Sequence, residues 1–354
     1  MPGAAGTASA VAVIGADIVA RAARVNSRPC RLVHTGAGLL RRVGDPGTIA
    51  TIRFRILMLR RPVLVLLLPL LLSGCSWTGL WYDNADWLAQ RWAARLVDAS
   101  DAQRTTWREP FRAAMADHRR DLLPQIIALL QALESEAERG LNAERLGCLL
   151  ETADGIYREH AALAVALGTL VLSDLSPAQL EHLAEELRER NRDYEEDYLQ
   201  PDPARRERER IERYVERIER WTGELPAAQL ALVEATVRSM PDLAAEWLAY
   251  RRQQQRHLLT LLGQSAGPAA LQRFLTAWWV ELADRPAELV DQGARIRAAS
   301  VRLALELDAA FSAEQRAGFR DRVRELRQDL GRAAPGPVPV QLSQALLAGC
   351  AAGI

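Results

Sequence analysis

Apolar positions three, four and seven residues apart dominate the chain between residues 87 and 331. This spacing gathers apolar side chains on one face of a helix, whereas a half-buried strand would alternate. One such face comprises Leu180, Leu183, Leu187, Tyr194 and Tyr198, and the next comprises Ile211, Tyr214, Val215, Ile218 and Trp221. The opposite face of the second helix is almost all Arg and Glu, which is typical of a solvated surface. The pattern predicts an all-α fold.

Helix-stop signals divide this region at intervals of roughly 15 to 30 residues. They fall at residues 140–142, 173–174, 201–203, 223–226, 240–241, 263–268 and 284–286, and from 331 onward. Short connections favour antiparallel neighbours, so we expect a multi-helix bundle or a stacked antiparallel helical array over residues 87–331. Residues 332–354 contain three prolines and are expected to form a loosely ordered tail.

Residues 58–74 have the three parts of a secretory signal peptide. Arg60 and Arg61 precede an apolar stretch, residues 62–72, and small residues follow it. The apolar stretch is shorter than the roughly 20 residues that a spanning helix needs. This segment therefore predicts export.

The sequence Leu72-Ser73-Gly74-Cys75 resembles a bacterial lipobox. The resemblance implies cleavage between Gly74 and Cys75, lipidation of the Cys75 sulfur, including palmitate, and a membrane partner through that lipid anchor. Ser76 follows the cysteine, which by similarity to sorted lipoproteins of Gram-negative bacteria implies the periplasmic face of the outer membrane. Residues 75–86 would then be a lipidated tether. The alternative is an uncleaved signal anchor with Cys75 as an ordinary thiol.

Residues 1–57 are rich in Ala, Gly and Arg and show no sustained period. Since a signal peptide belongs at the start of a chain, we interpret this segment as an over-extended, unstructured start, with translation beginning at Met58. The rival interpretation is an Arg-rich transit peptide.

Charge is distributed unevenly along the 354 residues, although the formal net charge is zero. There is no Lys, and ten of the 45 Arg lie in residues 1–74 with only two acidic residues. Residues 75–354 consequently carry eight more acidic than basic residues. An acidic body lacks the basic face that phosphate contacts need, so we expect no nucleic-acid partner.

One helix-start pattern occurs four times, at Ser100 and Gln103, Ser176 and Gln179, Pro226 and Gln229, and Ser312 and Gln315. A serine can cap a helix, and a Gln three residues later can reach back to the cap. The copy at Pro226 lacks the capping hydroxyl. These four segments are either ordinary helix starts or a motif with a further role.

The form Leu-Ser/Thr-x-x-Gln is similar to the LTXXQ motif of Spy-like periplasmic chaperones, which are small helical proteins that shield unfolded clients. A broader resemblance is to an uncharacterised proteobacterial lipoprotein family, a domain of unknown function. It is carried by the lipobox, by residues 81–88 (WYDNADWL), by residues 221–229 (WTGELPAAQ) and by residues 247–253 (WLAYRRQ). The resemblance implies an α-helical envelope lipoprotein and no known reaction.

Candidates for chemistry are sparse. His118, His160, His182 and His257 do not pair at ligand spacing, and residues 193–197 surround a helix rather than forming a calcium loop. We therefore expect no catalytic residue, no metal and no cofactor. Cys148 is interpreted as a core thiol, with a disulfide to Cys350 as the alternative.

The tryptophans allow two interpretations. Trp81, Trp87 and Trp92 follow the predicted anchor, where Trp can sit at a bilayer interface, but core packing is the commoner role. Trp278 and Trp279 are expected at the core and its rim.

These observations predict a non-enzymatic binding or chaperone-like envelope protein, with unfolded or envelope proteins as partners. A structural or assembly factor for an envelope complex is the alternative, and an uncharacterised enzyme is the third.

Overall fold

The computed structural model describes residues 82, 84–334 and 336, and all regular structure in that part of the chain is helical. The prediction of an all-α fold is confirmed. The first helices are α4 (Ala85–Leu96), α5 (Asp101–Asp117), the π-helix η1 (His118–Leu122), α6 (Leu123–Arg139), α7 (Ala143–Leu172) and α8 (Pro177–Tyr198). They are followed by α9 (Pro203–Thr222), α10 (Ala227–Ser239), α11 (Ala244–Gly263), α12 (Pro268–Leu275), the π-helix η2 (Thr276–Val280), α13 (Ala287–Ala310) and α14 (Ala313–Ala333).

Helix ends coincide with the stop signals in the sequence. Gly140 follows α6 with a φ of 89°, and Gly223 follows α9 with a φ of 82°. This left-handed conformation is open to glycine at little steric cost, so it ends each helix cleanly. α4 begins at Ala85 and α14 ends at Ala333, so the helical body extends two residues beyond residues 87–331 at either end.

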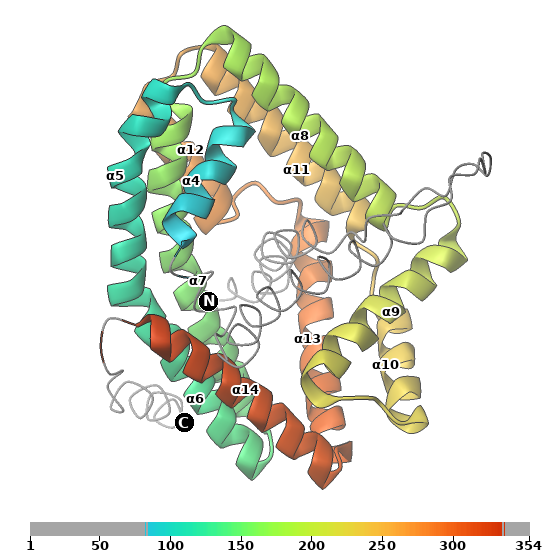
Figure 1. The fold of residues 1–354 in the computed structure, drawn as a ribbon. Helices are drawn as coiled ribbons and strands as arrows, with labels where there is room; N and C mark the ends of the chain where they lie inside the picture. The colour runs from blue at the N-terminus through green and yellow to red at the C-terminus, as the bar shows by residue number, and fades with distance from the viewer. Residues whose placement is uncertain (1–81, 83, 335, 337–354) are drawn as a thin grey trace, which may run out of the picture.

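Neighbouring helices run side by side around the perimeter of the molecule (Figure 1). α8 lies along α11, α9 along α10, and α14 along α6, while α4, α5, α7 and α12 gather at one corner. α7 and α13 are the longest helices. Helices distant in sequence also pair, and the contact of α6 with α14 holds the last described helix against an early one.

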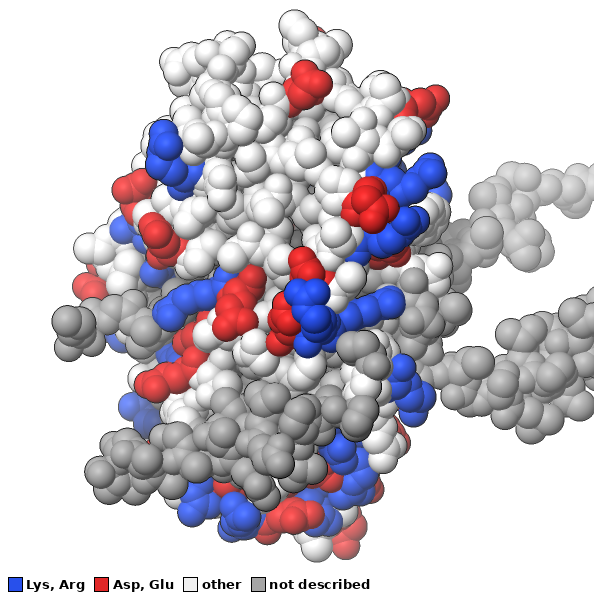
Figure 2. Space-filling model, turned by 90° about the vertical axis from the view of Figure 1, so that its left-hand side faces the viewer, with Lys and Arg blue, Asp and Glu red and all other residues white. Residues whose placement is uncertain are grey.

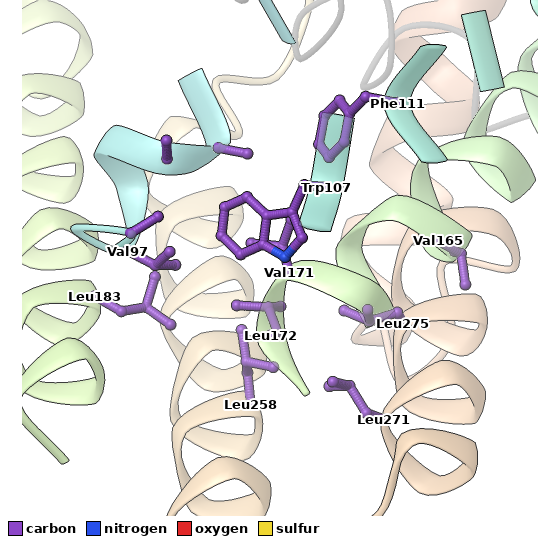
Figure 3. Close-up of a cluster of buried hydrophobic side chains, with 13 residues drawn as sticks. Val97, Trp107, Phe111, Val165, Val171, Leu172, Leu183, Leu258, Leu271 and Leu275 are labelled. Atoms are coloured by element: carbon purple, nitrogen blue, oxygen red, sulfur yellow. The ribbon is translucent and has the colours of Figure 1, made fainter. Parts of the chain in front are cut away.

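The largest hydrophobic core lies between α4, α5, α7, α8, α11 and α12. Trp107 occupies its centre in Figure 3, with Val97, Leu172 and Leu183 around it. All four of these side chains are buried. Burial of each aliphatic or aromatic side chain contributes about 1.5–3 kcal/mol, so this cluster is the main stabilising element of that corner.

A second core lies between α9, α10 and α13. Ile211, Val233 and Leu303 are buried there, and Phe311 packs against them. The apolar face predicted for residues 211–221 therefore points into a core. The residue before each of the four helix-start copies also packs in a core. Ala99 and Leu175 pack in the first core, and Leu225 and Phe311 pack in the second.

Candidate functional site

The four helix-start copies form the most regular polar arrangement in the described residues. Ser100, Ser176 and Ser312 each accept from the backbone N–H of the Gln three residues later, and that Gln side chain accepts from the N–H of the serine. These are complete capping boxes, which satisfy two otherwise unpaired donors at a helix start. Pro226 precedes α10 with no side-chain cap.

The first two copies meet across the molecule. Gln103 and Gln179 exchange hydrogen bonds between their side-chain amides, with Nε2 to Oε1 distances of 3.2 Å and 2.8 Å. Gln103 also donates to the carbonyl of Asp174, and Gln179 donates to the carbonyl of Asp98. The pair therefore joins the start of α5 to the start of α8.

The third and fourth copies repeat this arrangement. Gln229 and Gln315 exchange amide hydrogen bonds of 2.9 Å and 2.8 Å, and both side chains are buried. Gln229 also donates to the carbonyl of Ala310, and Gln315 donates to the carbonyl of Glu224. The start of α10 is thereby joined to the start of α14, even though Pro226 has lost its cap.

One rule describes all four glutamines. Each amide donates to its partner's amide oxygen and to the backbone carbonyl two residues before the partner's cap position. The pairs are thus two copies of the same pseudo-symmetric joint. The glutamine amides are neither acidic nor nucleophilic, so their role is structural. They fix the positions of the helix starts relative to one another.

An uncharged corner lies beside the first pair. Residues 160–173 at the end of α7 and residues 257–272, which run from α11 into α12, contain no Arg, Asp or Glu, and α7 packs against α12. Figure 2 shows the corresponding upper part of this side as mostly free of charged side chains. At its edge, a shallow hollow of about 480 Å³ is lined by Ala269 and Gln272 of this corner and by Arg273, Thr276 and Glu281 beyond it.

A known protein family matches the part of the chain that contains this corner and most of the glutamine motif. A model described as a family of unknown function, DUF6279, matches residues 95–280. The chain belongs to this family. The match includes both members of the first glutamine pair and Gln229 of the second. No curated protein and no solved structure matches the chain.

The structure of this DUF6279 protein brings together two histidines that the sequence keeps 42 residues apart. The rings of His118, in η1, and His160, in α7, meet edge to face with centroids 5.0 Å apart. The Tyr82 hydroxyl and Nδ1 of His118 share a hydrogen bond of 2.6 Å, and Arg119 donates to the Tyr82 carbonyl. Burial, with the positive charges of His160 and Arg119, lowers the pKa of His118 to about 4. No local sequence signal marks this cluster.

Two buried carboxylates of this chain have cationic partners. Glu136 is almost fully buried and lies 3.1 Å from Arg139 and 2.8 Å from Arg145. Asp154 lies 3.2 Å from Arg297. Among the described residues no three His, Cys, Asp or Glu side chains form a group that could hold a metal ion. His182 contacts the carbonyl of Arg95 instead.

Two of the tryptophans are largely exposed instead of packing in the core. Trp87 and Trp92 are 52% and 46% exposed, so the interpretation of these two as core residues is wrong. Trp278 and Trp279 are half-buried and pack against the large core. Trp279 lies so close to α7 that a Cβ on Gly168 would stand 2.7 Å from its ring.

The structure describes one of the cysteines for which the sequence made a prediction, Cys148. Cys148 is half-buried and disulfide-bonded, so its interpretation as a free core thiol is wrong. Its sulfur partner lies outside the described residues, as do Cys350 and the predicted cleavage site at Gly74 and Cys75. None of the described helices is both long enough and apolar enough to cross a membrane.

Proposed function

We propose that this chain is a lipoprotein attached through Cys75 to the periplasmic face of the outer membrane, with a non-enzymatic role in binding other envelope proteins. The lipobox-like sequence at Leu72 to Cys75 supports the attachment. The disulfide at Cys148 supports export, because disulfides persist in oxidising compartments such as the periplasm.

The uncharged corner carries the binding role. About a quarter of the chain is charged, yet two packed segments of 14 and 16 residues carry no Arg, Asp or Glu. A surface depleted of charge is typical of the centre of a protein–protein interface. The motif glutamines do not supply this role, because their amides are already engaged with one another.

Attachment is tested by metabolic labelling with palmitate. We expect label on the wild-type product and none on Cys75→Ser, because the hydroxyl cannot take the thioether-linked lipid. Intact mass of the membrane-extracted product should show that residues 1–74 are absent. Label that persists in Cys75→Ser, or a peptide from residues 1–57 in the mature protein, would overturn the proposal.

Binding is tested by placing a charge in the corner. Ala269 is exposed at the second position of α12, and Ala228 is exposed at the second position of α10. An acidic residue is tolerated in a first helical turn, so Ala269→Glu and Ala228→Glu should both fold. We expect Ala269→Glu to lose partners that co-purify from crosslinked envelopes and Ala228→Glu to retain them. Equal retention by both would exclude the corner.

The same purification separates the candidate functions. Many weakly held, unfolded clients, with suppression of client aggregation by the purified protein, support the chaperone-like role. A single stoichiometric partner supports the assembly role instead.

A further inference from the structure

Helix α4 has two chemically distinct faces. Its inner face consists of alanines: Ala85, Ala93 and Ala94 are buried, and Ala89 packs against the large core. Its outer face carries Trp87 and Trp92, which are the exposed large hydrophobic side chains of the described residues. The small inner residues allow close packing, while about half of each Trp stays exposed, 52% of Trp87 and 46% of Trp92.

Cations accompany both tryptophans. The guanidinium of Arg91 lies 5.1 Å from the ring of Trp87, and that of Arg190, from α8, lies 5.2 Å from the ring of Trp92. Arg95 is exposed one turn beyond Arg91. Acids near this face include Asp86, which is half-buried at its edge, Asp98, which is exposed just after α4, and Glu186, which lies 3.3 Å from Arg190. We call Trp87, Arg91, Trp92 and Arg95 the Trp–Arg face.

The position of this face along the chain limits what it can meet. Trp87 is the twelfth residue after Cys75, and a fully extended chain spans at most about 3.6 Å per residue, so Trp87 lies within about 43 Å of the Cys75 Cα. If Cys75 carries lipid, as the proposed function holds, α4 stays close to one membrane surface. Tethering of this kind gives the bilayer a high effective concentration at α4.

We infer that the Trp–Arg face docks on the phospholipid surface to which the protein is tethered. Indole rings sit at the headgroup level of bilayers, and exposed Arg attracts anionic headgroups. Residues 75–354 carry a net negative charge, which anionic lipids repel, so this basic and aromatic helix selects the side of the body that faces the membrane. The inference rests on the proposed lipid attachment.

Depth-dependent fluorescence quenching tests the docking. The lipidated protein is reconstituted in vesicles of phosphatidylethanolamine with a minority of phosphatidylglycerol, containing lipids brominated near the headgroup end of the acyl chain. The starting protein carries Trp77→Phe/Trp81→Phe, because Trp77 and Trp81 lie closer to Cys75 and would be quenched without any docking of α4. In this background we expect Trp87→Phe/Trp92→Phe to lose most of the quenched fluorescence. The half-buried pair Trp221→Phe/Trp247→Phe serves as the matched control and should retain it.

The outcomes separate the two proposals. A protein that does not float with the vesicles would show that the lipid attachment is wrong. A protein that floats, yet shows equal quenching in the Trp77→Phe/Trp81→Phe background with and without Trp87→Phe/Trp92→Phe, would overturn the docking alone. Arg91→Glu/Arg95→Glu should float normally with reduced quenching, and unchanged quenching in that variant would contradict the role assigned to the Arg side chains.

Discussion

Replacement of Gln315 by leucine is expected to lower the free energy of unfolding by about 3 kcal/mol. The substitution removes the amide that Gln229 both donates to and accepts from, and it also leaves the carbonyl of Glu224 without its donor. Gln229 and Gln315 are buried, so water does not replace the lost partners freely. An unsatisfied buried polar group costs about 1–3 kcal/mol, and here more than one is created. Urea denaturation measures the loss.

Gln103→Leu is the matched control for this prediction. Gln103 occupies the same motif position and makes the same set of contacts, but it and Gln179 are only half-buried. Water can therefore hydrate the groups left behind, and we expect a loss of about 1 kcal/mol. Equal losses at Gln103 and Gln315 would contradict the claim that burial sets the difference.

A double-mutant cycle on the buried pair isolates the contact between the two amides. In Gln229→Leu/Gln315→Leu neither side chain is left as an unpaired amide, so the double variant should be little less stable than either single variant. The coupling is expected to exceed about 1 kcal/mol, in the range found for residues in direct contact. Additive losses would mean that the two amides do not stabilise each other.

The glutamine pairs also show what the sequence can and cannot reveal. A capping box is local, because serine and Gln three residues apart contact each other in one turn, and the motif alone predicts it. The partner of each Gln lies 76 or 86 residues away, and its identity depends on how the helices pack. An even number of copies is compatible with pairing but does not say which copy meets which.

The exposure of Trp87 and Trp92 has a similar cause. Size and hydrophobicity favour burial of Trp, and the sequence offers no reason to prefer alanine as the inward face of the same helix. The structure packs α4 closely against α5, and alanines allow that short approach. Which face is buried was therefore decided by helix-to-helix distance, a tertiary property, rather than by the local pattern.

The Tyr82–His118–His160 cluster leads to the second large prediction, a loss of stability on mild acidification. His118 has a pKa of about 4 in the folded protein, against 6.5 as its ordinary value. Between these two pH values, the His118 ring is therefore protonated in the unfolded chain and neutral in the folded chain. Stability contributed by the neutral ring is complete above pH 6.5 and falls as the pH falls toward 4. At 1.36 kcal/mol per unit, the loss approaches about 3 kcal/mol.

Two substitutions separate this titration from that of the carboxylates. His118→Asn keeps an oxygen that can accept from the Tyr82 hydroxyl but cannot titrate, so its stability should change less between pH 6.5 and 5 than that of wild type. Burial also lowers the pKa of His160, which accounts for the pH dependence that this variant keeps. Tyr82→Phe removes the 2.6 Å hydrogen bond and leaves the histidine buried, so its pH dependence should persist at a lower overall stability. Burial is the largest cause of the lowered pKa, and Tyr82→Phe leaves that burial in place. If Tyr82→Phe loses the pH dependence and His118→Asn retains it, a group other than the His118 ring titrates, and the histidine is not the source of acid sensitivity.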